Sequence, residues 1–166
     1  GIASIFFGSK GYADTVISVA DFGLKPDTRE NAVAYVQKAI EACRGKEPVT
    51  LVFPEGRYDF WPQYAHEKNY YETNTYDVFP KRLAMLFEGL HNITVDGNGS
   101  QFVMHDRIQP ITVENCDGVT LKNFSIDWDI PLTAQARVTK VGSDFFEIEI
   151  NVLESPYIIE DGKLVF

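Results

Sequence analysis

The chain has 166 residues, of which 45% are hydrophobic and 13% aromatic, so it is long enough to bury a sizeable core. Its formal charge of −9 and its pI of about 4.7 argue against a nucleic-acid partner, because phosphate binding needs a positive field. The sequence has no run of about 18 or more apolar residues, so no membrane span is predicted. The apolar stretch within residues 1–8 is too short for a signal peptide and lacks its basic flank.

The first predicted elements are a strand over Thr15–Ala20 and a helix over residues 28–44. Asp27 is followed three residues later by Glu30, a pattern that resembles a capping box and predicts a helix start near Thr28. Apolar residues then recur at helical spacing, namely Val33, Val36, Ile40 and Cys43. The helix therefore has one apolar face to bury.

A buried strand is predicted over Val49–Phe53, but residues 61–82 have the periodicity of neither a helix nor a strand. This stretch is rich in aromatic residues set among polar ones. Such surroundings hold sugars, because an aromatic ring packs on the apolar C–H face while the hydroxyls find hydrogen-bond partners. Trp61 and Tyr64 are therefore candidate substrate contacts. The alternative is that these aromatic residues pack on the flank of the fold as a satellite core.

Residues 84–97 and 110–123 are two copies of one pattern. An offset of 26 residues places Ile93 on Val119 and also pairs Met85 with Ile111, Phe87 with Val113, Glu88 with Glu114, Thr94 with Thr120, Val95 with Leu121 and Gly97 with Asn123. A period in the mid-twenties, built from short strands without a helix between them, is typical of a solenoid whose coils stack strand on strand. The leucine-rich repeat is excluded because its Leu-x-x-Leu-x-Leu spacing is absent. The predicted fold class is all-β, a parallel β-helix with the helix over residues 28–44 capping the open end of its core.

The strand predicted over Asn123–Trp128 leads to two carboxylates. If Ile126 and Trp128 point inward, Asp127 and Asp129 share the outer face of the strand, roughly 7 Å apart. Two carboxylates on one face are a candidate acid–base pair. The alternative is an ordinary solvated face, since no His, Arg or Lys is adjacent in sequence to tune these two groups.

The pattern of apolar and polar residues changes after residue 131. Apolar and polar residues alternate on both sides of the turn Gly142-Ser143-Asp144, which predicts an antiparallel hairpin. We therefore divide the chain into the coils of residues 15–131 and an antiparallel module over residues 132–166, the beginning of a barrel or sandwich. The apolar segment Leu164-Val165-Phe166 would be an unpaired edge, so we expect the chain to be a piece of a longer protein.

No metal or cofactor is predicted. His66, His91 and His105 are scattered without the spacing of metal ligands. The segment Asp96-Gly97-Asn98-Gly99 has too few acidic ligands for a calcium loop and no later Glu. No phosphate-cradling loop is present.

Two sets of motifs resemble carbohydrate enzymes. Those at the start of the chain resemble the entry of β-helical enzymes such as polygalacturonases and pectate-lyase-like proteins: Asp21-Phe22-Gly23, Lys25-Pro26-Asp27 and Val52-Phe53-Pro54-Glu55-Gly56-Arg57-Tyr58. A more specific set resembles the N-terminal part of glycoside hydrolase family 110, the bacterial exo-acting α-1,3-galactosidases with a right-handed parallel β-helix: Asp59-Phe60-Trp61-Pro62, Pro80-Lys81-Arg82, Val95-Asp96-Gly97-Asn98-Gly99-Ser100 and Leu121-Lys122-Asn123-Phe124-Ser125-Ile126-Asp127-Trp128.

The resemblance implies a secreted or periplasmic glycosidase. Such an enzyme removes terminal α-1,3-linked galactose from glycans, without a metal and with inversion at the anomeric carbon. Inversion needs an acid and a base about 6.5–9.5 Å apart. The resemblance places both carboxylates on later coils, beyond Phe166, so this chain alone is expected to be inactive. Asp127 and Asp129 stay only as outside candidates for catalysis.

Two alternatives stay open at this point. One is a β-helical enzyme of different chemistry, such as a polygalacturonase or a calcium-dependent lyase that leaves an unsaturated sugar. The other is a non-catalytic carbohydrate-binding or tailspike-like module. Substrate turnover, calcium dependence and the ultraviolet absorbance of the products separate these readings.

Overall fold

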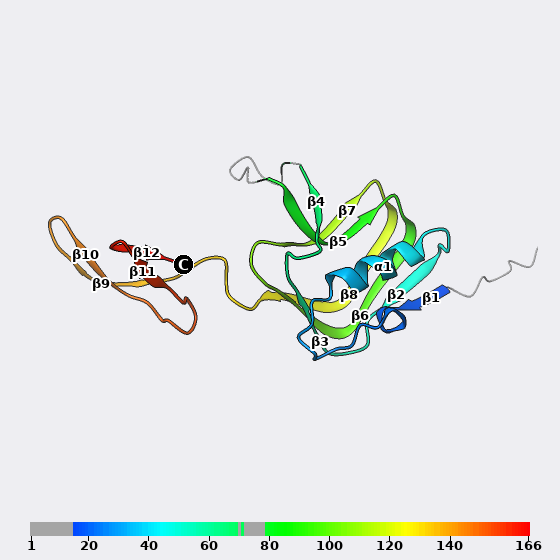
Figure 1. Cartoon of the computed structure of the whole chain (residues 1–166), viewed down its shortest axis with the longest axis horizontal. Coiled ribbons are helices and arrows are strands. Elements are labelled where there is room, and N and C mark those ends of the chain that lie inside the picture. Colours follow the sequence, from blue (N-terminus) through cyan, green and yellow to red (C-terminus); the bar gives the residue numbers. More distant parts are fainter. Residues whose placement is uncertain (1–14, 70, 72–78) are drawn as a thin grey trace, which may run out of the picture.

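The computed structural model describes residues 15–69, 71 and 79–166, and its elements are almost all strands (Figure 1). The helical elements of this described part are the 3-10 helix η1 (Val19–Phe22) and the α-helix α1 (Val33–Cys43). The strands are β1 (Thr15–Ser18), β2 (Val49–Val52), β3 (Arg57–Phe60), β4 (His66–Lys68), β5 (Lys81–Glu88), β6 (His91–Met104), β7 (Gln109–Glu114), β8 (Asp117–Trp128), β9 (Arg137–Val141), β10 (Phe146–Glu149), β11 (Ile158–Glu160) and β12 (Lys163–Val165). The all-β class predicted from the sequence is confirmed.

Parallel strands stack in two sheets. In the larger sheet β1 pairs with β2, β2 with β6 and β6 with β8, and β3 pairs with the second half of β6. In the smaller sheet β5 pairs in parallel with β7, while the short β4 runs antiparallel to β5. Successive passes of the chain therefore lie on one another, strand on strand, and similar positions of each pass face the same interior.

The two copies of the sequence pattern pair with each other as predicted. Met85 lies opposite Ile111 in the smaller sheet, and Ile93 lies opposite Val119 in the larger one, both at the offset of 26 residues. The offset changes along β6, because the register shifts between Asp96 and Ser100. The sequence alignment of Gly97 with Asn123 is therefore not a strand pair.

Gly97 instead marks a close approach between passes. A Cβ atom at this position would lie 2.5 Å from Cβ of Phe124 and 2.7 Å from the backbone oxygen of Asn123. Only glycine leaves room for the next pass of the chain here. The shift of register is thus tied to a position where two backbones pack directly on each other.

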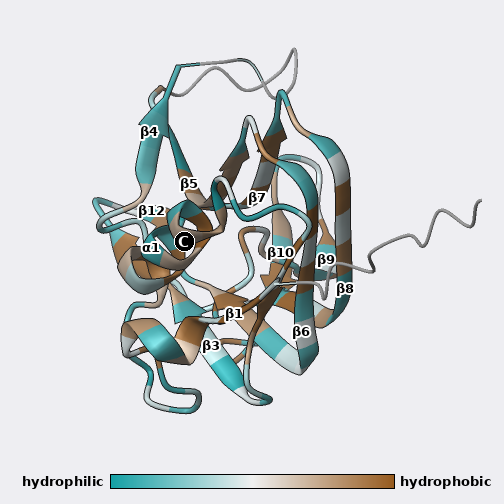
Figure 2. Cartoon of the chain, turned by 90° about the vertical axis from the view of Figure 1, so that its right-hand side faces the viewer, coloured by the Kyte–Doolittle hydropathy of each residue, from teal (hydrophilic) through white to brown (hydrophobic). Residues whose placement is uncertain are grey.

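The core lies between the two sheets, under α1. Phe102 is at its centre, with ring centroids 4.7 Å from Phe53, 5.7 Å from Phe60 and 4.8 Å from Phe124. Burying several aromatic rings against one another supplies both apolar area and favourable ring contacts. Figure 2 shows hydrophobic and hydrophilic residues alternating along the strands, as expected when one face of each strand turns inward.

Helix α1 begins at Val33 rather than near Thr28, so the predicted start is wrong by about one turn and a half. Asp27 does not cap the helix. It adopts a left-handed backbone with φ of 61°, and its Oδ1 accepts the backbone N–H of Arg57 at 2.9 Å. Asn31 is the residue that supports the helix start, because its Oδ1 accepts the N–H of Val33 at 3.1 Å. Helix α1 packs its apolar face against β5, η1 and the β1–β2 pair.

The predicted strand over Thr15–Ala20 is shorter in the structure. Strand β1 ends at Ser18, whose side chain accepts the backbone N–H of Ala20 and caps η1. Asp21 completes this capping box by accepting the N–H of Ser18 at 3.2 Å.

The last part of the described chain consists of two hairpins. Strand β9 pairs antiparallel with β10, and β11 pairs antiparallel with β12. Figure 1 shows both hairpins beside the stacked strands and joined to them by the segment after β8. Their strands are exposed on both faces, including apolar residues such as Val141, Phe146 and Ile159. The division of the chain near residue 131 stays a prediction.

Among the described residues, no helix has both the length and the apolar character needed to cross a membrane.

Candidate functional site

The ends of three stacked strands bring distant side chains together. Phe60 of β3, Met104 of β6 and Trp128 of β8 lie in register. The backbone continues this alignment by one residue, because the N–H of His105 donates to the oxygen of Phe60 at 2.9 Å and the N–H of Asp129 donates to the oxygen of Met104 at 3.0 Å. The residues that follow each strand are therefore neighbours in space.

A buried carboxylate organises the first group of side chains at this edge. The side chain of Asp59 is fully buried, and Arg57 donates two hydrogen bonds to it. Nη2 of Arg57 lies 2.6 Å from Oδ1 and Nε lies 3.0 Å from Oδ2. Nε2 of His105 lies 2.8 Å from Oδ1 of Asp59. Burial by itself would raise the pKa of Asp59, but the hydrogen bonds from Arg57 and His105 outweigh burial and hold its pKa below the usual value. Asp59 is therefore an ionised, fully satisfied carboxylate.

Asp129, the residue after β8, joins Asp59, Arg57 and His105, and we call these four residues the ion cluster. Asp127 does not belong to it. Oδ1 of Asp129 lies 3.0 Å from Nη2 of Arg57 and 3.9 Å from Nη1 of Arg29. Its other oxygen lies 3.8 Å from Nδ1 of His105. Asp127 instead accepts the backbone N–H of the next residue at 2.8 Å and is exposed. The two predicted carboxylates thus have different surroundings, and Asp129 is charge-paired.

The predicted aromatic candidates also differ from each other. The ring of Trp61 stacks on His105 with centroids 3.9 Å apart and an interplanar angle of 8°, so one face of the indole is covered. Tyr64 is 76% exposed, and its backbone oxygen accepts Nε2 of Gln37 at 3.0 Å. Trp61 therefore supports the ion cluster, whereas the ring of Tyr64 is open to solvent. Tyr70 and Tyr76, which share the aromatic-rich stretch, lie outside the described residues.

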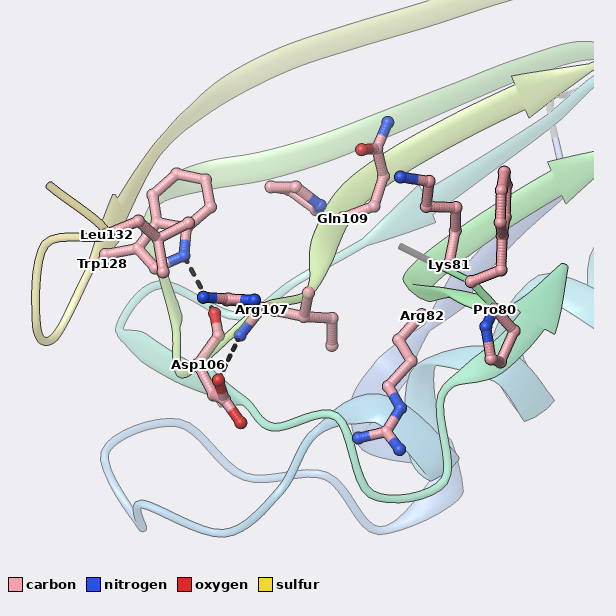
Figure 3. A pocket seen from close by; sticks show the side chains of 11 residues that line it. Pro80, Lys81, Arg82, Asp106, Arg107, Gln109, Trp128 and Leu132 are labelled. Atoms are coloured by element: carbon pink, nitrogen blue, oxygen red, sulfur yellow. Dashed lines mark hydrogen bonds between the residues drawn. The ribbon is translucent and has the colours of Figure 1, made fainter. Parts of the chain in front are cut away.

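A pocket of about 580 Å³ lies beside the ion cluster, and we call it the β5–β8 pocket (Figure 3). It is formed by the start of β5, the turn between β6 and β7, and the segment that ends β8. Its lining residues are Phe79, Pro80, Lys81, Arg82, Asp106, Arg107, Ile108, Gln109, Pro110, Trp128 and Leu132. Figure 3 shows Asp106, Arg107 and Trp128 at one end and Pro80, Lys81 and Arg82 at the other.

One turn supplies both the ion cluster and the pocket. His105 faces Asp59, whereas the next two residues, Asp106 and Arg107, line the pocket. The same division occurs at the end of β8, where Trp128 lines the pocket and Asp129 joins the ion cluster. The ion cluster therefore holds in place the backbone that forms one wall of the pocket.

The pocket combines positive charge with aromatic surface. Nε1 of Trp128 donates to the backbone oxygen of Asp106 at 3.3 Å, which fixes the indole against the turn. Oδ1 of Asp106 accepts the backbone N–H of Arg107 at 2.7 Å. Nε of Arg82 lies 3.4 Å from Oε1 of Glu67. An aromatic wall beside hydrogen-bond donors is the chemistry that binds a sugar.

Sequence reasoning missed most of these residues. His105 contacts Asp59 across 46 residues and Asp129 contacts Arg57 across 72 residues, so no local pattern indicates these contacts. Two local signals were available for the pocket. Trp128 ends one of the motifs that resemble carbohydrate enzymes, and it lines the pocket. The segment Pro80-Lys81-Arg82 belongs to the motifs that resemble carbohydrate enzymes, and all three residues line the pocket.

The described residues do not form a metal site. No three His, Cys, Asp or Glu side chains within the described ranges gather as a set of ligands. The stacked carboxylates of Glu88 and Glu114 are instead bridged by Nζ of Lys68, at 2.7 Å from each.

The chain is similar in sequence to known proteins. No protein-family model matches the chain. The chain is 60% identical over 154 residues to the alpha-1,3-galactosidase B of Bacteroides thetaiotaomicron, a match of 93% of the chain and 25% of the relative. It is 36% identical over 151 residues to the alpha-1,3-galactosidase A of Shewanella woodyi, covering 90% of the chain and 25% of the relative. An alpha-1,3-galactosidase B of Phocaeicola vulgatus is 36% identical over 150 residues, covering 88% of the chain and 24% of the relative.

Fold and site define an all-β protein of stacked parallel strands with an aromatic, positively charged pocket. The similarities make the chain a homologue of part of the alpha-1,3-galactosidases. The chain spans about a quarter of the length of the curated relatives it matches.

Proposed function

We propose that the chain is the N-terminal part of a glycoside hydrolase that removes terminal α-1,3-linked galactose from glycans. The observation that carries this proposal is the 60% identity to a protein named alpha-1,3-galactosidase B over 93% of the chain. The β5–β8 pocket, with an aromatic wall and polar donors, supports a carbohydrate ligand. A secreted or periplasmic location stays a prediction.

We also propose that the stacked strands are the first coils of a right-handed parallel β-helix. Support comes from the parallel pairing of β6 with β8 and of β5 with β7 at a common offset of 26 residues. Apolar residues on the last pass are left uncovered, with Val113 47%, Leu121 39% and Ile126 38% exposed. A further coil of the longer protein would bury these side chains as β8 buries those of β6.

The proposed mechanism is inversion by two carboxylates. One protonates the leaving oxygen and the other activates a water molecule, about 6.5–9.5 Å away. Asp59 is unsuited to act as the acid, because Arg57 and His105 hold it ionised and buried. Asp129 is paired with Arg57, whose Nη2 lies 3.0 Å from its Oδ1, so one of its oxygens is already engaged within the chain. We therefore place the acid and the base on later coils, with Asp127 and Asp129 as outside candidates and Trp61 and Tyr64 as candidate substrate contacts.

The test is galactose release from a Gal-α-1,3-Gal disaccharide by the full-length protein and, in parallel, by this chain alone. We expect release by the full-length protein only, with β-galactose as the first anomer seen by proton NMR, since the substrate is an α-galactoside. Release by the short chain would contradict the location of the catalytic pair. No release by either protein would contradict the galactosidase assignment.

The same assay tests the outside candidates. We expect Asp127→Asn and Asp129→Asn in the full-length protein to keep most of the activity. A loss of about a thousandfold in kcat in either variant, with an unchanged thermal transition, would assign that carboxylate to catalysis instead.

A further inference from the structure

We infer that the β5–β8 pocket binds the negatively charged group of a sugar, either a carboxylate or a sulfate ester. This inference rests on the proposed carbohydrate function and adds the charge class of the ligand. The juxtaposition that carries it is two arginine side chains beside an anchored tryptophan in one pocket.

The charge of the pocket is opposite to that of the chain. The chain as a whole carries −9, whereas the pocket is lined by two arginines, Arg82 and Arg107, and by one carboxylate, Asp106. Oδ1 of this carboxylate already accepts a hydrogen bond within the turn, from the backbone N–H of Arg107 at 2.7 Å. A local excess of positive charge on an acidic protein attracts an anionic ligand to this place.

The two arginines are available to a ligand. Arg107 is exposed, and its guanidinium makes no ion pair or hydrogen bond with another described residue. Arg82 contacts Glu67 at 3.4 Å, but both side chains are about half exposed, so this contact is weak and exchangeable. A guanidinium presents paired N–H groups that match the oxygens of a carboxylate or a sulfate.

The remaining wall fits the ring of a sugar rather than a free inorganic anion. The indole of Trp128 packs against the core and is held by its hydrogen bond to the oxygen of Asp106, so it offers a preorganised flat surface. Ile108 and Pro110 extend this apolar wall, and Gln109 adds an amide donor and acceptor. An anionic sugar uses all three features together, with its ring on the indole and its charge on the arginines.

The experiment is isothermal titration of the full-length protein with three monosaccharides: galactose, galacturonic acid and galactose 6-sulfate. We expect at least one charged sugar to bind about tenfold more tightly than galactose, and to bind less tightly as the salt concentration rises. Arg107→Gln is expected to remove this advantage, and Arg82→Gln to reduce it. Arg137→Gln on β9 is the matched control, since it removes the same charge from an exposed strand outside the pocket; its affinities should be unchanged.

The outcomes separate the two sources of charge and the two proposals. Preference for galacturonic acid assigns a carboxylate ligand, and preference for galactose 6-sulfate assigns a sulfate ester. Equal binding of all three sugars, absence of binding, or an unchanged preference in Arg107→Gln would overturn the inference. Hydrolysis of the neutral Gal-α-1,3-Gal disaccharide is measured on the same samples. Activity without charge preference leaves the galactosidase function standing, whereas charge preference without activity leaves only the binding pocket.

Discussion

Strands β6 and β8 carry the same alternation of apolar and polar residues, yet they differ in burial. Four apolar residues of β6 are fully buried: Ile93, Val95, Phe102 and Met104. Of their partners on β8, Leu121 is 39% and Ile126 is 38% exposed, while Val119 and Trp128 are half-buried. The reason is position in the stack. Strand β6 is flanked by β2 and β3 on one side and by β8 on the other, whereas β8 has β6 as its partner among the described strands.

The same difference separates two carboxylates that lie in one column. Asp59 of β3 and Asp127 of β8 both lie in register with Val103 of β6, one on either side of it. Asp59 is buried and bound by Arg57 and His105, whereas Asp127 is exposed and accepts the backbone N–H of Trp128. Residues in similar sequence patterns therefore contribute differently to stability, according to whether another strand covers them.

The largest expected effect is the loss of a ring from the inner strand. Phe102→Ala should lower the free energy of unfolding by about 4 kcal/mol, because it removes the ring that contacts Phe53, Phe60 and Phe124 and leaves a cavity. Chemical denaturation measures this change. Ile126→Ala, at the paired position of β8, should cost about 1 kcal/mol in this chain. Equal costs at the two positions would contradict the comparison.

The next largest effect is expected at the buried carboxylate. Asp59→Asn should lower the free energy of unfolding by about 3 kcal/mol, because it removes the buried carboxylate that Arg57 and His105 both contact. Asp127→Asn is the matched control and should change it by less than about 0.5 kcal/mol. A small effect at Asp59 would mean that the ion cluster does not hold the strand ends together.

A smaller effect is expected where two passes of the chain touch. Gly97→Ala should destabilise the fold by about 2 kcal/mol, because the new Cβ meets Phe124 and the backbone oxygen of Asn123 at less than 3 Å. Thermal unfolding followed by circular dichroism measures the change. A neutral result would show that β8 moves away from β6 easily.

Acid should remove the stability that Asp59 contributes. The folded pKa of Asp59 lies below its unfolded value of about 3.9, so the unfolded chain takes up the proton at a higher pH. The stability from Asp59 is therefore fully present above about pH 4 and decreases as the pH falls through the folded pKa. Denaturation curves between pH 6 and pH 3 should show a steeper loss in the wild type than in Asp59→Asn. Parallel curves would contradict this assignment.

Local patterns predicted the strands well and the helix start poorly. The alternation in residues 84–97 and 110–123 predicted the register of Ile93 on Val119, because burial of one strand face has a period of two. The pair Asp27 and Glu30 resembled a helix cap, but Asp27 bonds Arg57, 30 residues later. A cap is a local motif, and a long-range partner overrides it without leaving a local signal.

For the candidate site, too, the sequence indicated single residues but not their distant partners. Trp61 and Asp129 were recognised by residue type, yet their partners His105 and Arg57 were not, because they lie 44 and 72 residues away in sequence. Arg82 lay within a recognised motif, whereas Arg107 lines the pocket only because the β6–β7 turn faces the end of β8.

By itself the sequence determined the all-β class, the repeat and the pairing of its two copies, since these depend on side-chain alternation along single strands. The tertiary structure alone decided which copy is buried, which carboxylate is held ionised and which cations share a pocket. Burial and charge pairing depend on what lies across the fold, and strands stacked in parallel place residues far apart in the chain at neighbouring positions.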